Sequence, residues 1–149
     1  MRAREIMTEE PITCMPTDSL RSVAKLMADN MCGLLPVIDN LESMHLIGVI
    51  TDRDIVCRIL ANDSMDCNNA VVQDAMTTGR LWTVTADSSV DEVIEKMEDG
   101  QVRRIPVINE DNVIVGIIAT ADIALEIDDE AEIAEVFEEI SEPSDTPRA

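Results

Sequence analysis

The residues best suited to chemistry are the four at Thr51-Asp52-Arg53-Asp54. An apolar stretch ending at Ile50 predicts a strand that delivers Thr51 to the first turn of a helix. There a hydroxyl, free backbone N–H groups and the positive end of the helix dipole converge, which suits a phosphate. Asp54, one turn on, can accept hydrogen bonds from ribose hydroxyls. The same residues also form a capping box with Asp in place of Glu, so residue types alone do not separate a ligand contact from a helix cap.

An altered copy of this motif stands 68 residues further on, where Asp122 matches Asp54. Ala119 takes the place of Thr51, and Thr120 follows one position later. The carboxylate is kept while the hydroxyl is lost or shifted. We therefore expect two unequal sites, of which one or both take a ligand.

Arginines near the two motifs are candidate phosphate contacts, because a planar guanidinium pairs well with phosphate. Arg103 and Arg104 precede the middle strand of the second copy, where the first copy has Gly33 and Leu34. Arg53 is a further candidate within the first motif. The alternative is that each is a surface arginine paired with one of the abundant carboxylates.

Both motifs belong to a longer duplication, which chance explains poorly. Four blocks recur in order after 68 to 70 residues: Met7-Thr8 as Met76-Thr77, Asp18-Ser19 as Asp87-Ser88, Leu35–Ile38 as Ile105–Ile108, and Gly48–Ile50 as Gly116–Ile118. Each copy predicts the order β-α-β-β-α from its apolar periodicity. The predicted strands are 12–14, 34–38 and 46–50, then 81–84, 105–109 and 113–119.

The first helix of each copy has apolar residues at spacing i, i+3, i+4 and i+7 behind Ser and Asp caps. These residues are Leu20, Val23, Ala24 and Met27, and then Val90, Val93, Ile94 and Met97. The second helices begin at Thr51 and Thr120. One copy alone leaves an apolar sheet face open, so we predict a single α/β (α+β) fold with two repeats related by a pseudo-twofold axis.

The domain boundaries follow from this pattern. We place repeat 1 at 1–62, a polar surface linker at 63–70, repeat 2 at 71–126, and an acidic helix and tail at 127–149. An amphipathic helix is predicted over Asp128–Ile140, with Ile133, Val136, Phe137 and Ile140 on one face. We expect it to dock on its own domain, the alternative being a second chain. Beyond Ser141 we expect an extended or disordered run.

The net charge of −20 disfavours nucleic acid and acidic membrane surfaces as partners. A solvated acidic helix and tail explains much of it, with adaptation to high salt as an alternative. With His45 the only histidine and no CxxC pair among four cysteines, we predict no metal site, no catalytic residues and no enzyme. The first ten residues do not resemble a signal peptide. We therefore expect a cytoplasmic protein with four reduced, mostly buried thiols.

From about Ala3 to Leu125, each copy resembles a CBS domain (cystathionine-beta-synthase domain). The resemblance rests on the opening Met-Thr, the Pro-Val before a turn, and the sequence Gly-Val-Ile-Thr-Asp-Arg-Asp. The chain is similar to the stand-alone CBS-pair proteins, and the runs starting at Thr51 and Gln101 are similar to the hypoxic-response type.

This resemblance implies a regulatory module, often a homodimer. It binds AMP, ADP, ATP or S-adenosylmethionine in clefts between its repeats and signals to a protein partner by a conformational or oligomeric change. It implies no required cofactor. The residues near which adenine would be held are Ile12, Thr13, Leu35 and Pro36, or Thr83, Ile105 and Pro106. The alternative is a ligand-free interaction module that acts through its dimer surface and acidic tail helix.

Overall fold

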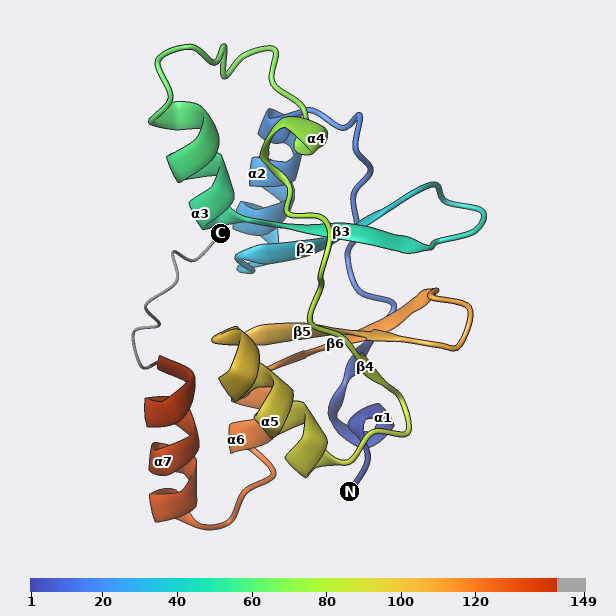
Figure 1. Ribbon diagram of the computed structural model, residues 1–149, viewed down its shortest axis with the longest axis vertical. Helices are drawn as coiled ribbons and strands as arrows, with labels where there is room; N and C mark the ends of the chain where they lie inside the picture. Colours follow the sequence, from blue (N-terminus) through green and yellow to red (C-terminus); the bar gives the residue numbers. More distant parts are fainter. Residues whose placement is uncertain (142–149) are drawn as a thin grey trace. The chain divides into compact units, whose positions relative to one another are not determined.

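The computed structural model describes residues 1–141 as two compact units, each with helices packed on one face of a small sheet (Figure 1). Among the described residues, unit 2 is the continuous stretch 12–81, whereas unit 1 combines residues 1–11 with residues 82–141. The combination of helices with mainly antiparallel strands confirms the predicted α+β class.

Unit 2 contains the helices and strands α2 (Leu20–Asp29), β2 (Leu34–Ile38), β3 (Leu46–Thr51), α3 (Asp52–Asp54), the π-helix η1 (Ile55–Leu60) and α4 (Val72–Ala75). Strands β2 and β3 form an antiparallel hairpin. Single bridges extend it on both sides: Cys14 lies parallel to Val37, and Thr77 antiparallel to Val49.

Unit 1 contains α1 (Ala3–Ile6), β1 (Thr8–Glu9), β4 (Val84–Thr85), α5 (Val90–Gly100), β5 (Arg104–Ile108), β6 (Ile114–Ala119), α6 (Thr120–Ala124) and α7 (Glu130–Ser141). Its sheet has the order β1-β6-β5-β4, with β4 parallel to β5 and the other pairs antiparallel. The bridges of unit 2 repeat this order, so the two units share one topology, as the duplication predicts.

The first residues of each repeat belong to the unit that is formed mainly by the other repeat. In unit 1, the backbone N–H of Ala3 donates to Ser88 at 2.8 Å, and β1 pairs with β6. In unit 2, the N–H of Val72 donates to Asp18 at 2.9 Å. The units of the structure therefore cut across the sequence repeats 1–62 and 71–126. Sequence periodicity did not reveal α1, β1 or α4, because elements of two to four residues are too short to show it.

The predicted helix starts are correct. Ser19 caps α2 by accepting a hydrogen bond from Ser22 N at 3.1 Å, and Ser89 caps α5 from Glu92 N at 3.2 Å. The helices bury most of the predicted apolar residues in aliphatic cores, but Ala24 is exposed. The strands predicted at 12–14 and 81–84 reduce to one bridge at Cys14 and to Val84–Thr85, because each runs along a sheet edge.

The thiol prediction was partly wrong. Cys14 is buried in the core of unit 2, and burial, followed by the nearby charge of Asp18, raises its pKa to about 12. Cys32 is half-buried, but Cys57 and Cys67 are exposed. The reason is that Cys57 lies on the outer side of η1, which the sequence pattern did not indicate, and that Cys67 lies in the predicted surface linker 63–70.

The C-terminal helix α7 docks on its own unit, as expected. Val136 and Ile140 are buried in the core of unit 1, and Gln101 Nε2 donates to the Glu139 carbonyl at 2.8 Å. The helix lies beside α5 (Figure 1). The expectation of an extended run after Ser141 falls outside the described residues.

Two carboxyl groups meet where α7 packs on α5. Burial, a hydrogen bond to Glu139 and the negative charges of Glu139, Asp99 and Glu95 raise the pKa of Glu98 to about 7. The folded chain therefore holds this proton more tightly than the unfolded chain does. The benefit is full below the ordinary pKa of 4.5 and is lost as the pH rises through about 7.

We expect Glu139→Gln to raise the melting temperature more at pH 8 than at pH 5, because it removes a repulsion that exists only when Glu98 is ionised. Differential scanning fluorimetry across this range measures the effect. The matched control is Glu138→Gln, which removes the same charge from an exposed neighbouring position on α7. An equal effect of Glu139→Gln at both pH values would contradict the prediction.

Candidate functional site

The helix start at Thr51 forms the capping box that the sequence suggested. Strand β3 ends at Thr51, whose Oγ1 accepts a hydrogen bond from Asp54 N at 3.1 Å. In return, Asp54 Oδ2 accepts one from Thr51 N at 2.9 Å. The cap is therefore real, and it turns the Asp54 carboxylate inward until the residue is only 2% exposed.

One oxygen of this carboxylate is left over. Asp54 Oδ1 is buried and has no hydrogen-bond partner among the described residues. The nearest cation is Arg58, whose Nε lies 3.7 Å from Oδ1, too far for a hydrogen bond. A buried acceptor without a donor is costly and uncommon in native proteins. Because this oxygen is closed off from solvent, a donor supplied from outside, such as a hydroxyl group, can reach it only after the side chains around Asp54 move.

The second helix start carries half of this arrangement. Asp122 Oδ2 accepts a hydrogen bond from Ala119 N at 2.8 Å, but an alanine side chain cannot return one. Thr120 is the first residue of α6, and both Thr120 and Asp122 are half-buried. The two helix starts are therefore unequal, with Asp54 the more deeply buried of the two carboxylates.

The predicted arginines lie beside the second helix start. In the β5–β6 pair Arg104 is opposite Ala119, and the Arg103 carbonyl accepts a hydrogen bond from Thr120 N at 3.0 Å. The Arg103 guanidinium is exposed and donates to Ser141 Oγ at 3.4 Å. Arg53, in the first motif, is also exposed. Within residues 1–141 no ion pair joins these three arginines to a carboxylate.

The residues expected near adenine divide by burial. Ile12 is 37% exposed and Thr13 is half-buried, just before the point where Cys14 N donates to Pro36 O at 3.1 Å. The side chains of Leu35 and Ile105 belong to the two cores. Those two residues can therefore offer a ligand only backbone groups, and Pro36 and Pro106 are buried as well.

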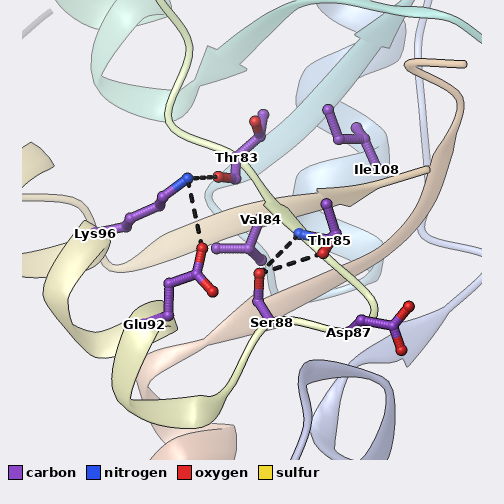
Figure 2. A pocket seen from close by; sticks show the side chains of 8 residues that line it. All are labelled: Thr83, Val84, Thr85, Asp87, Ser88, Glu92, Lys96 and Ile108. Atoms are coloured by element: carbon purple, nitrogen blue, oxygen red, sulfur yellow. Dashed lines mark hydrogen bonds and ion pairs between the residues drawn. The ribbon is translucent and has the colours of Figure 1, made fainter. Parts of the chain in front are cut away.

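Thr83 lines a cavity of about 260 Å³ in unit 1. Figure 2 shows Lys96 reaching from α5 to donate to the Thr83 carbonyl at 3.0 Å, with Glu92 Oε1 4.0 Å from its Nζ. Ser88 Oγ accepts from Thr85 N at 3.3 Å. Lys96 and Ser88 thus occupy backbone groups along the edge of β4, which protects this edge from pairing with another strand.

A family model described as "CBS domain" matches residues 3–61 and again 72–129. The chain belongs to the CBS-domain family. Hypoxic response protein 1 of Mycobacterium tuberculosis (strain ATCC 25618 / H37Rv) is 36% identical over 130 residues, which cover 87% of each chain. As a CBS pair, the chain is a regulatory module.

Two solved CBS structures resemble the chain closely. The crystal structure of Hypoxic Response Protein I with two coordinated zinc ions has a TM-score of 0.75 at 35% identity, covering 85% of this chain and 99% of the other. The CBS domain pair of protein MJ0100, in complex with 5′-methylthioadenosine and S-adenosyl-L-methionine, has a TM-score of 0.73 at 28% identity and covers 85% and 94%.

The two zinc ions are a property of that first structure. Across residues 1–141, no three His, Cys, Asp or Glu side chains are grouped as a metal site requires. His45 instead contacts the Asp39 carboxylate at 3.1 Å in the β2–β3 turn. Over the same residues, no helix of this CBS pair is both long and apolar enough to span a bilayer.

Sequence reasoning missed one residue of the first CBS repeat that the site contains. Arg58 lies four positions after Asp54, a spacing that brings opposite charges together on a helix. That spacing was the available signal. The spacing alone did not show that the carboxylate would be buried.

Proposed function

We propose that this CBS pair is a sensor for a ligand that contains adenosine, such as 5′-methylthioadenosine, S-adenosylmethionine, AMP, ADP or ATP. The observation that carries the proposal is the buried Oδ1 of Asp54, which lacks a donor. A ribose hydroxyl would donate to it in a charge-assisted hydrogen bond. Oδ2 would continue to cap α3, since the two oxygens have separate partners.

The residues beside each helix start indicate which of these ligands that helix start would prefer. Beside Thr51 the chain has Gly33 and Leu34, whereas beside Thr120 it has Arg103 and Arg104. Phosphate groups would therefore favour the second helix start. The first would favour an adenosyl compound without phosphates, the kind of ligand named for the MJ0100 pair.

Thermal melting with a panel of these five compounds tests the proposal. A compound that binds only the folded chain, at about 100 times its Kd, stabilises it by ~2.7 kcal/mol. For a chain of this size that corresponds to a rise in Tm of roughly 5–10 °C. Uridine, which has the ribose but not the adenine, is the control. No rise with any adenine compound would reject the proposal.

A second candidate function is a ligand-free interaction module. The observation that favours it is an exposed apolar strip on η1, where Val56 is 53% exposed and Leu60 60% exposed. The strip would be covered by a second copy of the chain in a homodimer, and α7 would offer acidic groups to a protein partner. Sedimentation of the wild type against Leu60→Glu tests this reading. The cytoplasmic location and the lack of a required cofactor stay predictions.

A further inference from the structure

Arg58 connects the candidate ligand-binding carboxylate to α4. Its Nε faces Asp54 Oδ1 at 3.7 Å, while its Nη1 donates to the carbonyls of Ala75 and Met76, both at 3.2 Å. These carbonyls stand at the end of α4, where helix carbonyls lack partners within the helix. One guanidinium thus faces Asp54 and also holds carbonyls that lie 17 and 18 residues after Arg58 itself.

Arg58 is the only cation within 4.0 Å of the Asp54 carboxylate in the described chain, and Asp54 is almost fully buried. A buried carboxylate without a paired cation is strongly unfavourable. Arginine suits this place because its planar group can face the carboxylate with Nε while Nη1 donates to the Ala75 and Met76 carbonyls. Arg58 therefore places a positive charge beside the Oδ1 side of the Asp54 carboxylate.

The second repeat lacks this connection. The residue four positions after Asp122 is Glu126, which has the opposite charge and is exposed. Helix α6 also ends earlier, at Ala124, and Asp122 is less buried than Asp54. Both copies therefore have the capping carboxylate, but only the first has an arginine that contacts both this carboxylate and the carbonyls at the end of α4.

We propose that Arg58 is a positioning residue that transmits occupation of the Asp54 site to the chain segment 76–81. This segment begins at the carbonyls that Arg58 holds and leads out of unit 2 toward Trp82. A ribose hydroxyl that donates to Oδ1 weakens the attraction between the carboxylate and Arg58. The guanidinium then binds the Ala75 and Met76 carbonyls more tightly, which reduces the motion of the segment 76–81. The proposal rests on the proposed function.

The test compares Arg58→Met with Arg21→Met, which removes an exposed arginine from α2 of the same unit. With 5′-methylthioadenosine as the probe, calorimetry should show about 10-fold weaker binding for Arg58→Met and less than 2-fold for Arg21→Met. Hydrogen exchange of peptides spanning 76–81 should slow on binding in the wild type and in Arg21→Met, but not in Arg58→Met.

A purely structural Arg58 would lower the melting temperature yet leave the exchange response to the probe unchanged, and that outcome would overturn the inference. Wild-type affinity in Arg58→Met would overturn it as well. If Arg58→Met does not fold, Arg58→Lys keeps the charge but not the planar fork that faces Asp54 while donating to the carbonyls of Ala75 and Met76. It should bind the probe while losing the exchange response at 76–81, and retention of that response would count against the proposal.

Failure of the proposed function gives a different pattern. In that case no compound of the panel binds the wild type. A ligand-free double-mutant cycle of Asp54→Asn and Arg58→Met still tests the pairing, through the urea midpoints of the four proteins. If the shift in midpoint of the double variant differs from the sum of the two single shifts, Asp54 and Arg58 are coupled as the proposal requires. If the shifts add, the proposal is overturned whether or not a ligand binds.

Discussion

Asp54→Ala should weaken the binding of 5′-methylthioadenosine by roughly 10- to 100-fold, which corresponds to the loss of one charge-assisted hydrogen bond of about 1.5–3 kcal/mol. The physical reason is that Oδ1 has an ion pair with Arg58 but no hydrogen-bond donor among the described residues, so a ribose hydroxyl bound there displaces no other hydrogen bond. Isothermal titration calorimetry measures the effect. The variant should also lose stability, because Oδ2 no longer caps α3.

Asp74→Ala is the matched control. Asp74 Oδ2 accepts a hydrogen bond from Val71 N at 2.9 Å, so it caps α4 in the way that Asp54 caps α3, but it is exposed. It should lose comparable stability and keep its affinity. Asp122→Ala removes the corresponding carboxylate of the second repeat and reports on any second site. Equal affinities for wild type and Asp54→Ala would reject the assigned role.

Gly48→Ala should destabilise unit 2 by about 1–3 kcal/mol, the usual range for forcing an extra carbon into a packed position. A Cβ at Gly48 would lie 2.8 Å from the backbone carbonyl oxygen of Thr77. That carbonyl accepts the Val49 N–H at 3.0 Å, and the Thr77 N–H donates back at 2.8 Å. The new carbon therefore forces apart the pairing that holds the segment after α4 against β3.

Urea unfolding measures this loss, and Gly33→Ala is the control. A Cβ at Gly33 would lie 3.0 Å from Asp52 Oδ2, but that carboxylate belongs to an exposed side chain that can swing away. We expect its cost to stay below about 1 kcal/mol. Gly116, in the same place of unit 1, would bring a Cβ to 3.1 Å from the Thr8 carbonyl and still closer to Met7. A small effect of Gly48→Ala would show that the pairing at Thr77 yields easily.

The sequence by itself determined the duplication, the hairpins and the caps. Strand β2 has the predicted bounds Leu34–Ile38, and Ser19 and Ser89 cap the helices that their spacing indicated. These features depend on local periodicity and on side chains that bond to backbone a few residues away. For the same reason Thr51 and Asp54 could be recognised as a pair, since a capping box spans only four residues.

The tertiary structure decided which groups of that pair remain available. Burial of Asp54 Oδ1 and its ion pair with Arg58 depend on the folding of η1 against α4, contacts that the residue types did not reveal. Likewise, no local sequence pattern indicated that α1, from the first repeat, packs in unit 1 and that α4, from the second repeat, packs in unit 2. Short elements gain their stability from the sheet they join rather than from their own periodicity, so only the folded chain shows where they lie.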